Sequence, residues 1–333
     1  MSQWIVTPDK FLTDEESKKL RRMCEEAAII AKSKGNQMAV RNRLIIEMAL
    51  GTGLRVSELA NLKIDDIHIR KGQNSLIVNN GKGDRKPQSG RWYRARHLAD
   101  LPSTKQTAME ALERTQAQLG QEKVESAVMP MVVENSNAAR LLYRLFQPLS
   151  GASIQQKNSF LDGKKEQQIA SKALTITDNP IIVRGLGSRL YDGDGIAAKE
   201  MPVIQDGVLK NYYIDVYYGR KLGWAPTTGY ASNIIIQPGK RSAKTIEKNL
   251  DRGILVTNWL GGNANGTTGD FYLGVAGWLI ENGQRTQPIG EMNISGNYSD
   301  LLMNLKEVGN DPYPYSSFRT PTLLFNDVSF SGT

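Results

Sequence analysis

The sequence predicts an α+β protein: a small helical segment with a β-hairpin, followed by an α+β region that ends in a β-rich domain. Three observations carry this prediction. Apolar residues recur at helical spacing through the first fifty residues. Two short β-prone runs flank a turn signal between residues 67 and 78. From about Ser171 onward, short strand-like runs alternate with turn residues at close intervals.

The first helix begins with a capping box, since Thr13 is followed three residues later by Glu16. Apolar residues then continue at helical spacing to Gly35, namely Leu20, Met23, Ala27, Ile30 and Ala31. A second apolar helix is expected around residues 44–49, ending at Gly51–Gly53, and a short helix near Ser57.

The hairpin is expected to consist of strands Ile67–Arg70 and Ser75–Val78. The intervening Lys-Gly-Gln-Asn is typical of a tight turn. The stretch Gly81–Arg96 is polar, basic and marked by glycine and proline, so we expect the junction between two parts of the chain there.

Beyond the junction, a helix is expected from Thr104 to Leu119, ended by Gly120. The apolar run Ala127–Val133 predicts a buried strand, and residues 137–149 have helical periodicity. The expected domains are residues 1–88, 89–170 and 171–333.

Seven runs in the last part predict strands. They are residues 174–178, 179–185, 208–217, 233–239, 253–262, 270–283 and 320–332. Two helical interruptions are expected, at Ala243–Arg252 and Tyr298–Val308.

The composition and charge of the chain restrict the classes of function to be considered. The formal charge is +8, and residues 1–88 contribute +5 of it, from 16 Lys+Arg and 11 Asp+Glu. Such a small excess is compatible with nucleic-acid binding but is more often a solvated face. A single cysteine, Cys24, excludes an internal disulfide. No apolar run is long enough for a membrane span and no signal peptide is evident, so we expect a cytoplasmic protein without membrane partners.

The front of the chain carries Thr-Gly-Leu-Arg-Val-Ser-Glu-Leu at 52–59 and Gly-Lys-Gly at 81–83. Through these strings, residues 10–86 resemble the front half of the catalytic domain of tyrosine recombinases, the phage integrases. The resemblance implies that Arg55 grips the phosphate oxygens of DNA and that Lys82 is the proton donor to the leaving oxygen. These are the two candidate catalytic residues, and the set is incomplete.

The remaining recombinase parts are missing. His97 is followed three residues on by Asp100 rather than arginine, and His68 precedes Lys82, in the wrong order. No tyrosine can be assigned as the nucleophile, and without one no covalent strand cleavage is possible. We therefore predict no recombinase activity, and weak DNA binding by residues 1–96 at most.

A second group of strings runs in order along the rest of the chain: Arg96–Pro102, Asp178–Pro180, Gly185–Ser188, Asp192–Gly195, Thr268–Phe271, Glu281–Gly283, Gly309–Asp311 and Arg319–Leu323. Through them, residues 90–333 resemble the TldD/PmbA peptidase family. The resemblance implies a system of two subunits, a zinc-bearing TldD-type peptidase and a PmbA (TldE)-type partner without zinc ligands. It also implies that an intact member carries a long α/β domain ahead of this region, which the integrase-like segment replaces here.

The zinc motif of the TldD-type subunit is a His-Glu-x-x-x-His helix with a later cysteine. Alignment on residues 149–151 places Leu142 and Gln147 at the histidine positions and Tyr143 at the glutamate position. Tyr313–Ser317 stands where the cysteine is expected. Because these side chains are not zinc ligands, we expect no metal and no cofactor, and a PmbA-like partner of a zinc-bearing TldD-type subunit or of itself.

The glycine- and asparagine-rich stretch Gly261–Thr268 is most simply interpreted as a loop between two strands. In the family, such loops can border the peptide channel. Asn263, Asn265 and Asp270 are therefore the candidate substrate-binding residues.

Three functions stay open from the sequence. The first is a non-catalytic PmbA-like subunit of a metallopeptidase, fused to an inactive integrase fragment. The second is a DNA-binding remnant of an integrase. The third is a fusion product with no evolved function, which detection of the full-length polypeptide in cells would argue against.

Overall fold

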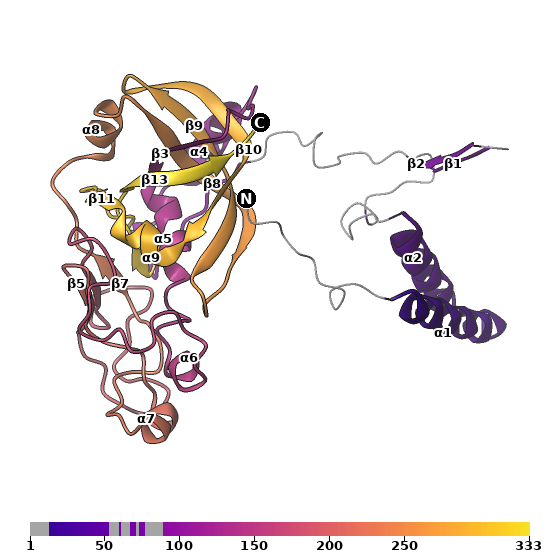
Figure 1. The fold of residues 1–333 in the computed structure, drawn as a ribbon, viewed down its shortest axis with the longest axis horizontal. Coiled ribbons are helices and arrows are strands. Elements are labelled where there is room, and N and C mark those ends of the chain that lie inside the picture. The colour runs from indigo at the N-terminus through magenta and orange to yellow at the C-terminus, as the bar shows by residue number, and fades with distance from the viewer. Residues whose placement is uncertain (1–12, 53–59, 61–66, 71–72, 77–88) are drawn as a thin grey trace. The chain divides into compact units, whose positions relative to one another are not determined.

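The computed structural model describes residues 13–52, 60, 67–70, 73–76 and 89–333 (Figure 1). The chain divides into two compact units, Met1–Lys86 and Pro87–Thr333. Arg55, Lys82 and the helix expected near Ser57 lie outside the described residues. The further division expected at residue 170 stays a prediction.

The first unit contains two helices, α1 (Asp14–Ser33) and α2 (Met38–Thr52). The capping box at the start of α1 is confirmed: the Thr13 hydroxyl accepts from the Glu16 amide, and the Glu16 carboxylate accepts from the Thr13 amide. The two helices lie antiparallel, because one ion pair joins Arg21 to Glu47 at 3.4 Å and another joins Arg43 to Glu25 at 2.9 Å.

The face of α1 that is turned away from solvent differs from the apolar stripe in the sequence. Ala28 is buried, and Leu20, Cys24 and Ala31 are partly covered. Met23 and Ile30 both remain 57% exposed. The helix was therefore predicted correctly, but its apolar periodicity identified the covered face only in part, through Leu20 and Ala31.

The same unit contains a hairpin of β1 (Ile67–Arg70) and β2 (Gln73–Leu76). The strands are antiparallel, with Ile67 opposite Leu76 and Arg70 opposite Gln73. The second strand thus begins two residues earlier than predicted.

The second unit is built on a six-stranded sheet in the order β10-β9-β8-β3-β13-β11. Because β10 also pairs with β13, five of these strands close into a ring (Figure 1). The strands are β3 (Ala127–Val133), β8 (Arg252–Ala264), β9 (Asp270–Glu281), β10 (Gln284–Asn297), β11 (Leu305–Val308) and β13 (Leu323–Ser331). Alternating buried side chains on these strands fill the ring with the main hydrophobic core.

A second sheet of five short strands has the order β12-β7-β4-β5-β6. Its strands are β4 (Ile176–Asp178), β5 (Met201–Gln205), β6 (Val208–Leu209), β7 (Ile234–Ile236) and β12 (Phe318–Arg319). The loops around it are long, and α6 and α7 lie at the same end of the unit (Figure 1).

Helices connect and cover the two sheets. They are the 3-10 helix η3 (Leu98–Asp100), α4 (Thr104–Gln116), α5 (Asn135–Tyr143), α6 (Gly151–Gln155), α7 (Val216–Leu222), α8 (Ala243–Lys248) and α9 (Tyr298–Met303). Several begin at a side-chain cap, such as Ser103 for α4 and Asp215 for α7. None of the helices in the described part of the chain combines the length and hydropathy that a membrane crossing requires.

The predicted α+β class is confirmed, as is the buried strand Ala127–Val133. The helices predicted over residues 104–119 and 137–149 exist but end earlier, at Gln116 and Tyr143. Three other local predictions are wrong. Residues 179–185 form turns rather than a strand. In residues 208–217 the strand ends at Leu209 and α7 follows, because Asp215 caps a new helix. The helix from Tyr298 ends at Met303, since β13 recruits Leu305–Val308 as a strand.

Candidate functional site

Two adjoining hollows follow helix α5 in the second unit. Their volumes are about 510 and 420 Å³. Arg140 and Tyr143 line both of them, so the hollows form one groove along α5 that is interrupted at Tyr143. We call the two parts the Trp92 hollow and the Gln147 hollow. Volumes in this range are typical of sites for small molecules or short peptide segments.

The Trp92 hollow has a wall made by the extended segment Ser89–Arg94. Buried Tyr313 holds this segment in place, because its hydroxyl donates to the Trp92 carbonyl at 3.3 Å. Arg91 Nε lies 3.1 Å from the Glu110 carboxylate, which also accepts from the Tyr93 hydroxyl. The segment is therefore held both by α4, through Glu110, and by the loop between β11 and β12, through Tyr313.

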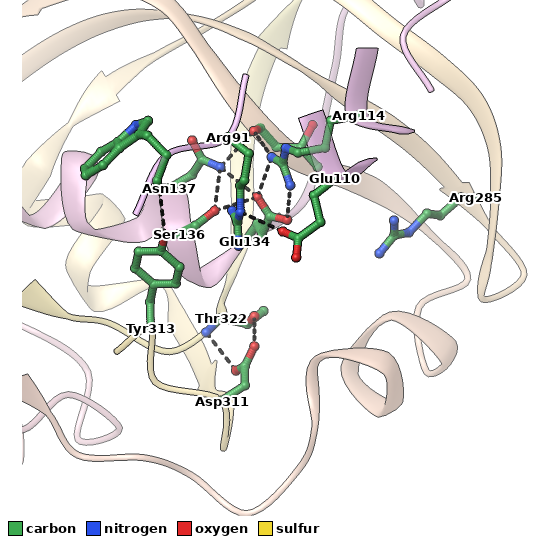
Figure 2. Close-up of polar contacts among 12 residues, drawn as sticks. Arg91, Glu110, Arg114, Glu134, Ser136, Asn137, Arg285, Asp311, Tyr313 and Thr322 are labelled. Atoms are coloured by element: carbon green, nitrogen blue, oxygen red, sulfur yellow. Dashed lines mark hydrogen bonds and ion pairs between the residues drawn. The ribbon is translucent and has the colours of Figure 1, made fainter. Parts of the chain in front are cut away.

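The floor of the Trp92 hollow is a polar network around Glu134, the residue that precedes α5 (Figure 2). Both Glu134 carboxylate oxygens accept from Arg114 at 2.8 Å. Ser136 Oγ and Asn137 Nδ2 also donate to this carboxylate, each at 2.8 Å. Burial opposes ionisation of Glu134, but these hydrogen bonds outweigh it, so the pKa of Glu134 lies below its ordinary value. Glu134 is thus a paired structural carboxylate and does not face the hollow as a free base.

Strand β3 ends at Val133, which pairs with Val256 of β8. Beyond this pair, the same edge of β8 runs beside α5 and has no neighbouring strand among the described residues. Side chains satisfy the carbonyl groups that lack a strand partner there. The Thr257 carbonyl accepts from Arg114 at 3.0 Å and from Asn137 at 2.8 Å.

Two arginines of the α5 segment continue this pattern. Arg140 donates to the Trp259 carbonyl at 3.4 Å, and Arg144 donates to the Gly262 carbonyl at 3.3 Å. Since backbone carbonyls are neutral, these contacts position the guanidinium groups without neutralising their charge.

The Gln147 hollow lies between the end of α5 and the turn that joins β8 to β9. Gln147 Nε2 donates to Ser153 Oγ at 2.9 Å. A Cβ atom on Gly266 would lie only 2.0 Å from Gln147 Oε1. Because glycine has no Cβ, the turn can approach the Gln147 side chain this closely. Tyr298 closes the opposite side and donates its buried hydroxyl to the Leu141 carbonyl at 3.0 Å.

The residues that the sequence resemblance assigns to the zinc positions do not have the chemistry of zinc ligands. Leu142 is 1% exposed and belongs to the hydrophobic core, whereas Tyr143 is 64% exposed at the groove. The Tyr143 ring packs against Phe318 with 5.4 Å between ring centroids, and Phe146 packs against the same ring at 4.8 Å. Zinc requires about three nitrogen, sulfur or carboxylate ligands, and this surface offers aromatic rings and an amide.

The segment Tyr313–Ser317, which the sequence resemblance places where the family's cysteine is expected, also lacks a zinc ligand. Within Tyr313–Ser317, Tyr313, Ser316 and Ser317 line the Trp92 hollow together with Tyr143. The fold therefore brings to one groove the two segments that the sequence resemblance assigned to the zinc motif, and the groove-lining side chains of both are poor zinc ligands. In the part of the chain that the structure describes, no three His, Cys, Asp or Glu side chains gather closely enough to hold a metal ion.

The three candidate substrate residues lie at the turn between β8 and β9. Asn265 lines the Gln147 hollow, but its side-chain oxygen also accepts from the Thr267 amide at 2.9 Å. Asp270 accepts from Thr268 Oγ1 at 2.7 Å and Asn297 Nδ2 at 3.0 Å, and these bonds lower the pKa of its carboxyl. Asn263 is exposed on β8 and does not line either hollow. Their role as substrate contacts stays a prediction, with Asn265 the best placed.

Sequence reasoning missed the arginines of this groove. Arg140 and Arg144 are spaced four residues apart in a helical pattern, so a shared face could have been expected. Arg91, Arg94 and Arg114 come from other segments and are brought to the groove only by the fold. The recombinase-type candidates Arg55 and Lys82 lie outside the described residues.

Comparisons with known proteins match both halves of the sequence. Residues 126–332, more than half of the chain, match the family of the PmbA/TldA metallopeptidase C-terminal domain. Residues 10–145 match the phage integrase family. The two matches overlap at residues 126–145, and in the fold this stretch supplies β3 at the centre of the six-stranded sheet.

Among curated proteins, the chain is 30% identical over 240 residues to Metalloprotease PmbA of Escherichia coli O157:H7, covering 71% of this chain and 53% of that protein. It is 28% identical over 220 residues to a PmbA homolog of Haemophilus influenzae, covering 65% of this chain and 49% of that protein. The chain thus spans about half the length of the curated relatives it matches.

Among solved structures, a Bacteroides thetaiotaomicron protein described as a candidate modulator of DNA gyrase is 42% identical, with a TM-score of 0.70 over 72% of this chain and 55% of that one. TldE from Thermococcus kodakarensis shares the fold, with a TM-score of 0.63 and 24% identity over 68% of this chain and 55% of that one. With the family match over residues 126–332, these findings show that the chain belongs to the PmbA/TldD metallopeptidase family.

Proposed function

We propose that the chain is a non-catalytic, PmbA (TldE)-like subunit of a TldD/PmbA-type metallopeptidase system. The observation that supports this most is the chemistry of the groove at the zinc positions. There Leu142 is in the core, while Tyr143 and Gln147 face the groove and cannot serve as a histidine–glutamate zinc motif. A subunit of this kind contributes a peptide-binding surface and leaves hydrolysis to a zinc-bearing partner.

The groove is suited to hold a peptide segment in extended form. It offers aromatic walls at Trp92, Tyr143 and Phe318, and hydrogen-bonding groups from Ser316 and Asn258. At its far end, the turn that carries Asn265 reaches the Gln147 hollow.

Co-expression with a zinc-bearing TldD-type subunit tests the proposal. We expect a stable heteromeric complex by size-exclusion chromatography with light scattering, and peptide hydrolysis only when the partner is present. The absence of a complex at micromolar concentrations, or hydrolysis by this chain alone, would contradict the proposal. Removing the partner's metal with a chelator should abolish hydrolysis and leave the complex intact.

A second candidate function is weak DNA binding through the first unit, Met1–Lys86. It is favoured by the integrase match over residues 10–145 and by the basic excess of residues 1–88. In this proposal Arg55 and Lys82 contact DNA phosphates.

The full chain is tested by anisotropy with a labelled duplex at increasing salt. We expect weak binding that falls steeply with salt, and no covalent adduct on a suicide substrate. A trapped protein–DNA adduct would contradict the predicted inactivity, and binding unchanged by Arg55→Ala with Lys82→Ala would contradict the assigned contacts.

A further inference from the structure

The charged side chains that line the α5 groove are all arginines. They are Arg91, Arg94, Arg114, Arg140 and Arg144, and no aspartate or glutamate lines either hollow. A concave surface with charges of one sign raises the local concentration of ligands of the opposite sign.

Two of the five arginines are neutralised by neighbouring carboxylates. Arg91 pairs with Glu110 at 3.1 Å and Arg114 with Glu134 at 2.8 Å. These pairs hold the walls of the Trp92 hollow in place, and their charge is already compensated.

The other three have no carboxylate partner in the described part of the chain. Arg94 lies over the Trp92 ring, 4.8 Å from its centroid. Arg140 and Arg144 each donate one hydrogen bond to a β8 carbonyl. A guanidinium has five N–H donors, so each of these two groups is held in position while most of its donors stay available. A positioned guanidinium loses less conformational entropy on binding an anion than a free one.

Two exposed aromatic side chains of the groove, Trp92 and Tyr143, already contact neighbouring groups of the groove with part of their ring surface. Arg94 lies over the ring of Trp92, and Tyr143 packs against Phe318 and Phe146. Single-stranded nucleic acid binds through open aromatic faces together with a long basic track. Three uncompensated arginines in a groove of two hollows are better suited to one or two carboxylates of a peptide.

We propose that the α5 groove selects acidic peptides, with Arg140 and Arg144 binding a peptide carboxylate and Arg94 adding to the attraction. This inference rests on the proposed peptide-binding role. Its ligand class is a short extended peptide with glutamate or aspartate side chains or a free C-terminal carboxylate.

The test is fluorescence anisotropy on the full chain alone with three labelled peptides of equal length. One carries glutamates and a free C-terminus, one carries glutamines and a C-terminal amide, and one carries lysines. At low salt we expect the acidic peptide to bind about tenfold more tightly than the neutral one, and its advantage to shrink as salt screens the charges. A fourth peptide, with glutamines and a free C-terminus, separates side-chain from terminal carboxylates.

The variant Arg140→Gln with Arg144→Gln should remove the preference for the acidic peptide and leave binding of the neutral peptide unchanged. Arg140→Lys with Arg144→Lys keeps the charge and should retain part of the preference. Arg252→Gln, at the exposed start of β8 and outside both hollows, is the matched control and should behave like the parent. Unchanged thermal midpoints show that each variant is folded.

Equal affinity for acidic and neutral peptides would overturn the inference, as would a preference that survives the double glutamine variant. Tighter binding of single-stranded DNA at this groove, lost in the same variant, would also overturn it in favour of a nucleic-acid site. No partner subunit is present in this peptide-binding assay. Failure to form the heteromeric complex would therefore be a separate result, which would count against the proposed subunit role and leave the measured peptide preference unchanged.

Discussion

Arg114 and Glu134 form a two-pronged ion pair that joins the end of helix α4 to the start of helix α5 (Figure 2). Both nitrogen–oxygen distances are 2.8 Å, and the side chains are 23% and 27% exposed. The same guanidinium reaches the Thr257 carbonyl on β8 at 3.0 Å. One side chain thus ties α4, α5 and the edge of β8 together beneath the Trp92 hollow.

Removing this arginine should destabilise the second unit. Arg114→Ala leaves the part-buried Glu134 carboxylate without its charged partner and removes one of the two donors to the Thr257 carbonyl, which costs about 2–3 kcal/mol. Four of the five tryptophans lie beyond residue 86, so tryptophan fluorescence reports mainly on this unit. We expect the thermal midpoint to fall by roughly 5–10 °C. Arg252→Ala should change it by less than about 1 °C, and an equal fall in both variants would contradict the role of the pair.

The same pair predicts a pH dependence of stability. The pKa of Glu134 in the folded chain is below its ordinary value, so its ionised form stabilises the fold. This contribution is complete above the pKa of an unfolded glutamate, about 4.3, and is lost as pH falls through the lower folded value.

The thermal midpoint of Glu134→Gln should therefore lie furthest below that of the parent at pH 7 and approach it as the pH falls below about 4. Other groups also titrate there, among them Asp178, whose burial raises its pKa. The difference between parent and variant removes their contribution. A difference that does not change between pH 7 and pH 3 would contradict the assignment.

A glycine on β9, which lies between β8 and β10 in the six-stranded sheet, should tolerate no side chain. A Cβ at Gly277 on β9 would lie 1.8 Å from the Leu255 carbonyl oxygen on β8, and backbone atoms cannot move aside as a flexible side chain can. We expect Gly277→Ala to cost more than about 3 kcal/mol or to prevent soluble expression. Gly193→Ala, where no atom lies within 4 Å of the new Cβ, should express and melt like the parent.

The hydroxyl of Tyr298 should stabilise the end of α5. It is buried and donates to the Leu141 carbonyl at 3.0 Å. Tyr298→Phe keeps the ring and removes only this donor, so we expect a loss of about 1 kcal/mol in the free energy of unfolding. Tyr272→Phe removes a hydroxyl from a ring that is 42% exposed and should have no measurable effect. An equal loss in both would indicate that the Leu141 bond contributes nothing.

Purified full-length protein should carry far less than one zinc per chain. The groove presents Tyr143 and Gln147 where zinc ligands would be needed. Elemental analysis after dialysis against zinc-containing buffer gives the measurement, and bound zinc should not exceed that of the Tyr143→Phe variant. Stoichiometric zinc that this substitution removes would contradict both this prediction and the proposed non-catalytic role.

The sequence by itself determined much of the local structure and the family. The capping box at Thr13, the apolar run Ala127–Val133 and the ordered turn motifs are local patterns, and each depends on residues only a few positions apart. The absence of histidines from the zinc positions could also be read directly, because ligand chemistry is a property of the side chain.

Tertiary structure alone decided which helix face is covered, where strands end and what the site contains. Residues 305–308 became strand β11 because β13 pairs with them, which no local propensity encodes. The groove joins Trp92, Arg140 and Tyr313, which are far apart in the chain. Whether an arginine is neutralised, as Arg114 is, or held uncompensated, as Arg140 is, depends on which groups the fold brings near it. That is a matter of distance in space, and a sequence gives only distance along the chain.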